Sequence, residues 1–278
     1  MVNTNNRRTI LFMVLGILAT CIMMFPVYWM FITSIKPLNE IFSSPPIFFP
    51  NEPTFKPYVE IFQGEKSMLL YMKNSFIIGS GSMLLTLLLS APAAYALARK
   101  KITGLVVIVG ILITSQMFPT IIMATPLYII YQKIGLTDTF LGLIIANTTV
   151  LLPFAIILLR PFFLRLPKGL EEAALIDGCN KFTTFFKVIL PLTRTGLITV
   201  GTFTFLMAWN ELLFALTLSN DNSMRPVTVG IFNYMGEYQS VWNNLMAASF
   251  VSSLPIVIAF IFLQKYIVDG LTTGATKG

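Results

Sequence analysis

Six long apolar runs separated by polar connections dominate the pattern of this 278-residue chain. Each run is long enough for an α-helix to cross the hydrocarbon core of a bilayer. None shows the period-two alternation of a transmembrane β-barrel, so helices are the structure that satisfies the backbone amides in lipid. The pattern therefore predicts an all-α, polytopic membrane protein with six transmembrane helices. The predicted spans are residues 10–32, 76–98, 105–130, 140–159, 197–218 and 245–263.

Composition agrees with a membrane protein and excludes several functions. Only 11% of residues are charged and 55% are hydrophobic, against about 25% charged in soluble domains. The spans leave no stretch for a separate soluble domain, so residues 1–278 are expected to form a single transmembrane domain. The net charge of +7 is spread over positions that flank the spans. It forms no aromatic-interleaved patch that would predict nucleic-acid binding.

Residues that commonly ligate metals are scarce. The chain has no histidine and two cysteines, Cys21 in the first span and Cys179 in a polar loop. Neither a zinc, haem or copper site nor a disulfide framework is expected from such a set. Clustered intramembrane carboxylates for acid and base roles are also missing, which disfavours a membrane-embedded enzyme. We expect no catalytic residue and no metal site on this chain.

Lysine and arginine residues predict the orientation. With the N-terminus in the cytoplasm and six crossings, thirteen of the nineteen basic residues fall on the inner side, as the positive-inside rule requires. Both termini are then cytoplasmic, and so is the loop of residues 160–194. Arg99, Lys100 and Lys101 are expected to anchor a helix end at anionic headgroups. The outer connection of residues 33–71 is proline-rich and predicts extended turns, either as a folded lid or as a docking surface for an extracytoplasmic partner.

The cytoplasmic loop carries the most informative pattern. Residues 170–177 predict a short helix whose first turn holds Glu171 and Glu172, which complement the helix dipole. Gly178 is expected to end it. Leu170, Ala174 and Asp177 would share one side, an apolar stripe flanked by acids that suits a groove on another protein. An amphipathic loop at the membrane interface is the alternative. Residues 181–190 resume a helical pattern before Pro191.

The order of residues in this loop resembles the EAA loop of binding-protein-dependent ABC importer permeases. The matching positions are Glu172, Ala173, Ala174, Asp177, Gly178, Ile189, Leu190 and Pro191. Other segments similar to the maltose-type, carbohydrate-uptake branch are NSFIIGS and AAYALAR within residues 74–99, TPLYIIYQKIGLTDTFLGLI at residues 125–144, and AWNELLFAL at residues 208–216. Cys179 and Thr195 depart from the family pattern, where alanine and proline are usual. They put only the packing after Gly178 in doubt.

The resemblance implies a heteromeric importer in a bacterial or archaeal plasma membrane. A second homologous permease subunit would complete the path, two ATP-binding subunits would drive it, and an extracytoplasmic sugar-binding protein would deliver the solute. ATP and Mg would belong to the partner subunits, and this chain has no G-x-x-x-x-G-K-[ST] loop to hold phosphates. The residues that the resemblance assigns to ATPase coupling are Glu171, Glu172, Ala173, Ala174, Asp177 and Gly178.

Polar residues within the spans are the remaining candidates. Glu211 lies inside the fifth apolar run beside Trp209 and Asn210, where a charge is costly and is expected to face protein or water. These three residues either line the sugar path or serve a pairing role in the bundle. Gln116, Asn147 and Asn244 are interpreted as interhelical hydrogen-bonding groups. The small residues 79–82 predict close helix packing.

Two alternatives in function stay open. An ABC importer for another solute would share the cytoplasmic loop, because only the wider resemblance selects sugars. An ion-coupled secondary carrier would use Glu211 as its proton-coupling acid. Dependence of uptake on an ATPase partner separates the carrier from the importer.

Overall fold

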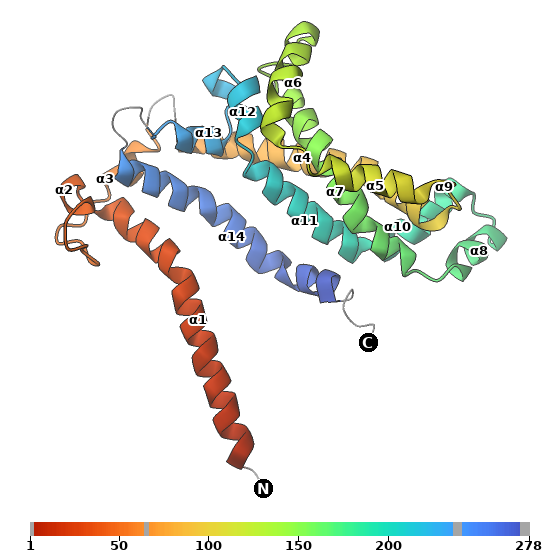
Figure 1. Ribbon diagram of the computed structural model, residues 1–278, viewed down its shortest axis with the longest axis horizontal. Helices are drawn as coiled ribbons and strands as arrows, with labels where there is room; N and C mark the ends of the chain where they lie inside the picture. Colours follow the sequence, from red (N-terminus) through yellow and green to blue (C-terminus); the bar gives the residue numbers. More distant parts are fainter. Residues whose placement is uncertain (1–2, 64–66, 236–240, 273–278) are drawn as a thin grey trace. The chain divides into compact units, whose positions relative to one another are not determined.

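A computed structural model describes residues 3–63, 67–235 and 241–272 (Figure 1). Every regular element in these ranges is a helix, which confirms the all-α prediction. The α-helices are α1 (Asn3–Ile35), α2 (Leu38–Ile41), α3 (Lys56–Glu60), α4 (Met68–Arg99), α5 (Leu105–Ser115), α6 (Thr120–Ile134), α7 (Phe140–Leu164), α8 (Gly169–Ile176), α9 (Lys181–Thr184), α10 (Leu190–Leu192), α11 (Arg194–Trp209), α12 (Leu213–Leu218), α13 (Val227–Phe232) and α14 (Trp242–Thr272). A π-helical turn, η1 (Phe185–Ile189), and a 3-10 turn, η2 (Asn222–Met224), complete the set.

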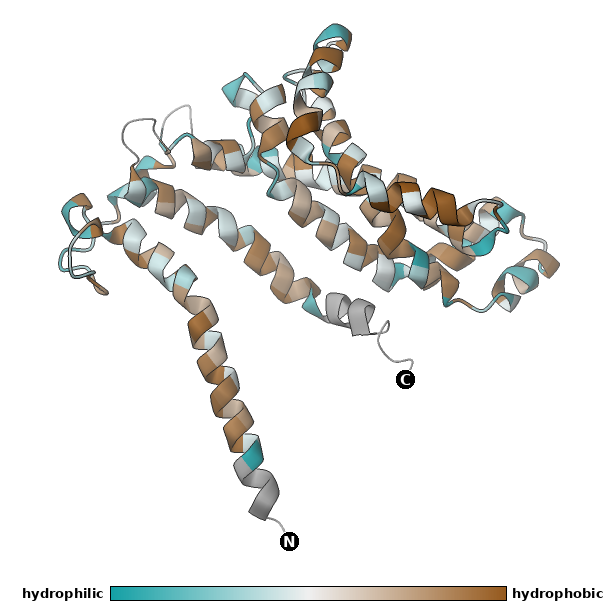
Figure 2. Ribbon diagram, viewed as in Figure 1, coloured by the Kyte–Doolittle hydropathy of each residue, from teal (hydrophilic) through white to brown (hydrophobic). Residues whose placement is uncertain are grey.

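Four helices among the described residues are long and apolar enough to cross a membrane, and two sharply bent helix pairs raise the number to six if each pair is one span. The four cover Arg8–Ile35, Met68–Arg99, Phe140–Leu164 and Trp242–Gln264. Figure 2 shows the apolar residues that run along α1 and α5. The chain is therefore a multi-pass membrane protein.

The third predicted span is not one helix. The structure divides residues 105–130 between α5 and α6, which meet at an angle of 91°. The break ends at Pro119, which precedes the first residue of α6 with φ −63° and ψ 127°. Proline lacks an amide hydrogen and disfavours helical conformation in the residue before it, so a helix cannot pass unchanged through this position. The prediction of a continuous helix here was wrong.

The fifth predicted span is also interrupted. Helix α11 ends at Trp209, and α12 begins only at Leu213. At its other end, α11 follows the segment Lys181–Leu192 at an angle of 77°. The prediction of one helix over residues 197–218 was therefore wrong at residues 210–212, where the adjacent polar residues Asn210 and Glu211 interrupt the apolar run.

Contacts divide the chain into two compact units, Met1–Met68 with Ile231–Leu254, and Leu69–Gly230 with Pro255–Gly278. In the first unit the outer connection folds against the end of α1. The Tyr28 hydroxyl donates to the Phe48 carbonyl at 2.8 Å, and the rings of Trp29 and Phe48 lie 5.6 Å apart. Asn244 donates to the Glu60 carboxylate at 2.9 Å, and this bond holds the pKa of Glu60 below its usual range. The described part of this connection is thus folded, and its service as a docking surface stays a prediction.

In the second unit, the tight packing of α4 depends on two glycines. A Cβ atom at Gly79 would lie 3.0 Å from the Phe205 ring of α11. One at Gly81 would clash with Ile144 of α7. The small-residue patch therefore permits close approach of α4 to its neighbours, as predicted. The core at the other end of α4 is made of buried residues that include Ala91, Ala94, Leu159, Phe163, Ile189 and Val200.

A loop clamp stabilises the opposite end of this unit. Asp138, in the turn between α6 and α7, accepts hydrogen bonds from the backbone amides of Asn220 and Asp221. Its own amide donates to the Leu218 carbonyl at 2.9 Å. The clamp fixes the chain that leaves α12, next to the break in the fifth predicted span.

Candidate functional site

Helix α8 forms as the sequence predicts. It carries Glu171 and Glu172 in its first turn, where the free amides favour negative charge. Gly178 adopts φ +84°, the left-handed conformation that glycine tolerates best. The amides that follow the helix close the turn, since Gly178 donates to Leu175 at 3.1 Å and Cys179 donates to Ala174 at 2.9 Å. A Cβ at Gly178 would meet no atom of this chain within 4 Å.

The exposed face of α8 differs from the predicted stripe. Ala174 is 6% exposed and faces the chain's own packing, so Leu170, Ala174 and Asp177 do not form one free surface. Glu172 and Ala173 are exposed, and Ile176 is 86% exposed. The exposed face of α8 is therefore built on Glu172, Ala173 and Ile176, with the Gly178 turn at its end.

Glu171 is directed into the protein. Its carboxylate oxygen lies 2.8 Å from Nε of Arg99, and the two side chains are 25% and 5% exposed. Arg99 also donates through Nη2 to the Leu166 carbonyl at 2.6 Å. The prediction that Arg99 anchors at lipid headgroups was wrong, because burial and these contacts occupy its guanidinium. Lys100 and Lys101 remain exposed at the helix end.

The segment after α8 adds apolar side chains to the exposed surface. Asn180 caps α9 by accepting from the Thr183 amide at 2.8 Å. Phe182 is 72% exposed, and its ring lies 4.5 Å from that of Phe186. Phe185 instead is buried against Tyr95 of α4, at 5.0 Å between centroids. The helical pattern predicted for residues 181–190 is confirmed, divided among α9, η1 and α10.

The break at residues 210–212 is held by Glu211. One carboxylate oxygen accepts from the Phe214 amide at 2.8 Å, and the other accepts from the Ala215 amide at 3.1 Å. The Glu211 carbonyl accepts from the Thr228 hydroxyl at 2.7 Å. The side chain thus satisfies amides at the start of α12 that have no partner within the helix. This capping gives the acid in the apolar run a structural role, whereas the sequence predicted either a place on the sugar path or a pairing role.

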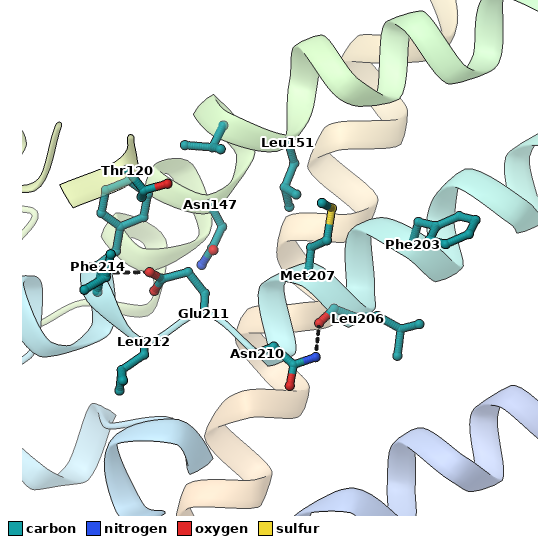
Figure 3. Close-up of a pocket in the computed structure, with 12 residues that line it drawn as sticks. Thr120, Asn147, Leu151, Phe203, Leu206, Met207, Asn210, Glu211, Leu212 and Phe214 are labelled. Carbon is teal, nitrogen blue, oxygen red and sulfur yellow. Dashed lines mark hydrogen bonds between the residues drawn. The ribbon is translucent and has the colours of Figure 1, made fainter. Parts of the chain in front are cut away.

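A cavity of about 540 Å³ lies beside this break. Its lining includes Asn147 from α7 and Asn210 and Glu211 from the break, together with apolar side chains (Figure 3). In Figure 3 the Asn147 amide and the Glu211 side chain turn toward the same space. Trp209 is 3% exposed and packs against the Phe205 ring at 5.7 Å, so it lies outside this lining.

Asn147 was predicted as an interhelical hydrogen-bonding group. Its amide nitrogen instead donates to the Leu143 carbonyl of its own helix at 2.9 Å, and the residue lines the cavity. Nothing in the local sequence distinguishes it from other span asparagines. The exposure of Ile176 and Phe182 was also not predicted from the sequence, although apolar residues in a polar loop were an available signal.

Residues 87–273 match a family model that is described as "Binding-protein-dependent transport system inner membrane component". The trehalose transport system permease protein of Mycobacterium tuberculosis is 37% identical over 276 residues, which cover 98% of this chain and 99% of that protein. The sulfoquinovosyl glycerol transport system permease protein of Agrobacterium fabrum is 36% identical over 255 residues, 92% of this chain and 89% of that one.

A solved structure shares the fold. It is the crystal structure of a bacterial ABC transporter involved in import of the acidic polysaccharide alginate. The match has a TM-score of 0.76 at 23% identity and covers 96% of this chain and 98% of the solved chain. With the family model and the sequence relatives, it follows that this chain belongs to the family of binding-protein-dependent transport system inner membrane components.

Proposed function

We propose that this chain is a permease subunit of an ATP-driven ABC importer for a sugar or oligosaccharide. The support comes from relatives named for trehalose and for sulfoquinovosyl glycerol transport, which align over almost the whole chain. A permease of Thermococcus litoralis named for trehalose and maltose is 35% identical over 273 residues. These relatives are named for different glycosides but have similar sequence identity to this chain. They therefore support a sugar as the class of solute and do not identify the particular sugar.

The subunit works in a complex. Besides this chain, the complex contains a second homologous permease, two ATP-binding subunits that hold ATP and Mg, and an extracytoplasmic sugar-binding protein. The family description, which names binding-protein dependence, supports the last of these partners. A solved relative of 13% identity and TM-score 0.67 was crystallised with a periplasmic protein bound to an alginate pentasaccharide. Residues 1–278 act as one permease domain in the plasma membrane of a bacterium or archaeon, with both termini in the cytoplasm.

The observation that carries the coupling mechanism is the exposed face of α8. Glu172, Ala173 and Ile176 point away from the chain's own packing, and the Gly178 turn is open on its outer side. Such a short helix with a small residue at its centre fits a cleft on an ATP-binding subunit, where Glu172 meets basic side chains. Closure of the ATPase pair on ATP moves the cleft and with it the permease. The ATP-bound pair must therefore bind the outward-facing arrangement more tightly than the inward-facing one.

The cavity at the helix break supports a place on the solute path. Asn147, Asn210 and Glu211 line it. Amide and carboxylate groups beside apolar side chains suit the hydroxyls and ring faces of a sugar. Glu211 contributes by fixing the break, because its carboxylate already accepts two backbone hydrogen bonds. Trp209, predicted for the same path, is buried against Phe205 and does not line this cavity.

Reconstitution of the complex tests this function. The copurified subunits are placed in proteoliposomes, and uptake of labelled trehalose and other α-glucosides is measured with ATP supplied on the ATPase side. We expect uptake to require both ATP and the binding protein. Uptake driven by an ion gradient alone would favour the secondary carrier and contradict the proposal. Uptake of a non-sugar solute with ATP would keep the importer and reject the sugar.

A further inference from the structure

The side chain of Arg99 joins three separate segments of the second unit. Arg99 is the last residue of α4, and its Nε forms the ion pair with Glu171 in the first turn of α8. Its Nη2 donates to the carbonyls of Leu166 and Pro167, in the turn that connects α7 to α8, at 2.6 and 3.5 Å. One planar guanidinium therefore holds the end of α4, the α7–α8 turn and α8 together.

The contacts of α8 make this junction important. Besides Arg99, α8 packs mainly against α9 and η1, which belong to the same cytoplasmic loop. The junction itself is stiff, because Arg160 of α7 donates to the Leu97 carbonyl of α4 at 3.2 Å. The Tyr95 ring lies 5.8 Å from Phe163 and 5.0 Å from Phe185. A displacement of α8 is thus passed to the α4 end, where close packing transmits strain.

Helix α4 leads from this junction toward the cavity helices. Farther along α4 the packing is close: a Cβ atom at Gly79 would lie 3.0 Å from the Phe205 ring of α11, and one at Gly81 would clash with Ile144 of α7. Phe205 in turn packs against Trp209, the last residue of α11 before the break. Helix α4 is thus tied to the cytoplasmic loop at its end and packed against α11 and α7 in its interior, so it can couple that loop to the residues that precede the break.

We propose that Arg99 is a positioning residue that transmits movement of α8 to α4 through its ion pair with Glu171. The proposal rests on the function given above and divides the two adjacent acids between two tasks. Glu172 faces the ATP-binding subunit, and Glu171 faces inward and fastens α8 to the membrane helices. Lysine could not replace Arg99 fully, because a single ammonium lacks the fork that reaches Glu171 and the Leu166 carbonyl from different nitrogens.

The test measures coupling and not only uptake. Complexes that carry Arg99→Gln, Glu171→Gln or both changes are reconstituted, and the solute moved per ATP hydrolysed is determined together with the copurified ATPase. We expect each single variant to lower this ratio at least about fivefold, the low end of ordinary coupling between sites, with assembly intact. The double variant should be no worse than Arg99→Gln alone, since Arg99→Gln already removes the ion pair that Glu171→Gln removes. Lys100→Gln, which removes an exposed charge one residue away, should leave the ratio unchanged.

Three results would overturn the proposal. The first is an unchanged ratio in either single variant, and the second is a double variant whose loss is the product of the single losses. The third is loss of the ATPase subunits from the Glu171→Gln complex, because the pair would then serve docking and not transmission. Failure of the function itself looks different: the wild-type complex would then show no ATP-dependent uptake.

Discussion

Substitutions of Gly178 separate two effects: backbone strain in the turn that follows α8, and steric contact between that turn and the ATP-binding subunit. The residue has φ +84°, and a side chain placed there would meet no atom of this chain within 4 Å. An L-residue in the left-handed region costs about 1–2 kcal/mol, which is roughly a factor of 5–30 in an equilibrium constant. Gly178→Ala should weaken association with the ATP-binding subunit by at most this factor, which is reached when the strained turn relaxes in the free permease and must be restored on binding. Any larger loss must come from contact with the partner.

Gly178→Leu should lose more than Gly178→Ala, because its side chain projects from the turn toward the docked subunit. Gly178→Asn is the matched variant: asparagine has nearly the shape of leucine and tolerates the left-handed conformation, so it should recover most of the strain. The assay is titration of reconstituted permease with the purified ATP-binding subunit, together with uptake. Equal losses for alanine and leucine would refute contact at this turn, and wild-type association of Gly178→Leu would refute docking there altogether.

Three further predictions follow from single residues. Glu172→Lys reverses an exposed charge on α8 and should abolish uptake while membrane content of the chain stays normal; normal uptake would contradict docking at this face. Glu211→Ala leaves the Phe214 and Ala215 amides without their acceptor, which costs about 1–3 kcal/mol for each buried group. Thermal unfolding of the complex should therefore occur at a lower temperature than with Glu211→Gln, which keeps one acceptor. Asp138→Ala should destabilise the loop after α12 by about 1 kcal/mol. Hydrogen exchange of the backbone amides at residues 219–221 should then be faster, and an unchanged exchange rate would exclude the clamp.

Local signals made α8 predictable. The alanines and leucines, the acids in the first turn and the terminal glycine all act within a few residues of one another, and each favours the same short helix. The same reasoning could have found the α5–α6 bend, because Pro119 stands inside the third apolar run. The span was predicted from hydropathy alone, which does not take account of the effect of proline on helix geometry.

The contacts that complete the site are not local. Arg99 and Glu171 are 72 positions apart, and a basic residue at a helix end is equally compatible with lipid headgroups. The interruption after Trp209 depends on Glu211, whose carboxylate replaces the missing intrahelical partners of α12. Sequence reasoning identified Glu211 as unusual in lipid and could not choose between a path and a structural role. The direction of the Ala174 side chain was likewise set by tertiary packing.

Crosslinking from the exposed face of α8 tests the central claim most directly. A cysteine is placed at Ala173 in a Cys21→Ser, Cys179→Ser background, so that the new thiol is the only one on the chain. In membranes that contain the whole complex, a bifunctional thiol reagent should join Ala173→Cys to an ATP-binding subunit, with a yield that changes when ATP is added. A thiol that reacts with an impermeant reagent from outside the cell, or that never reaches the ATP-binding subunit, would contradict the account.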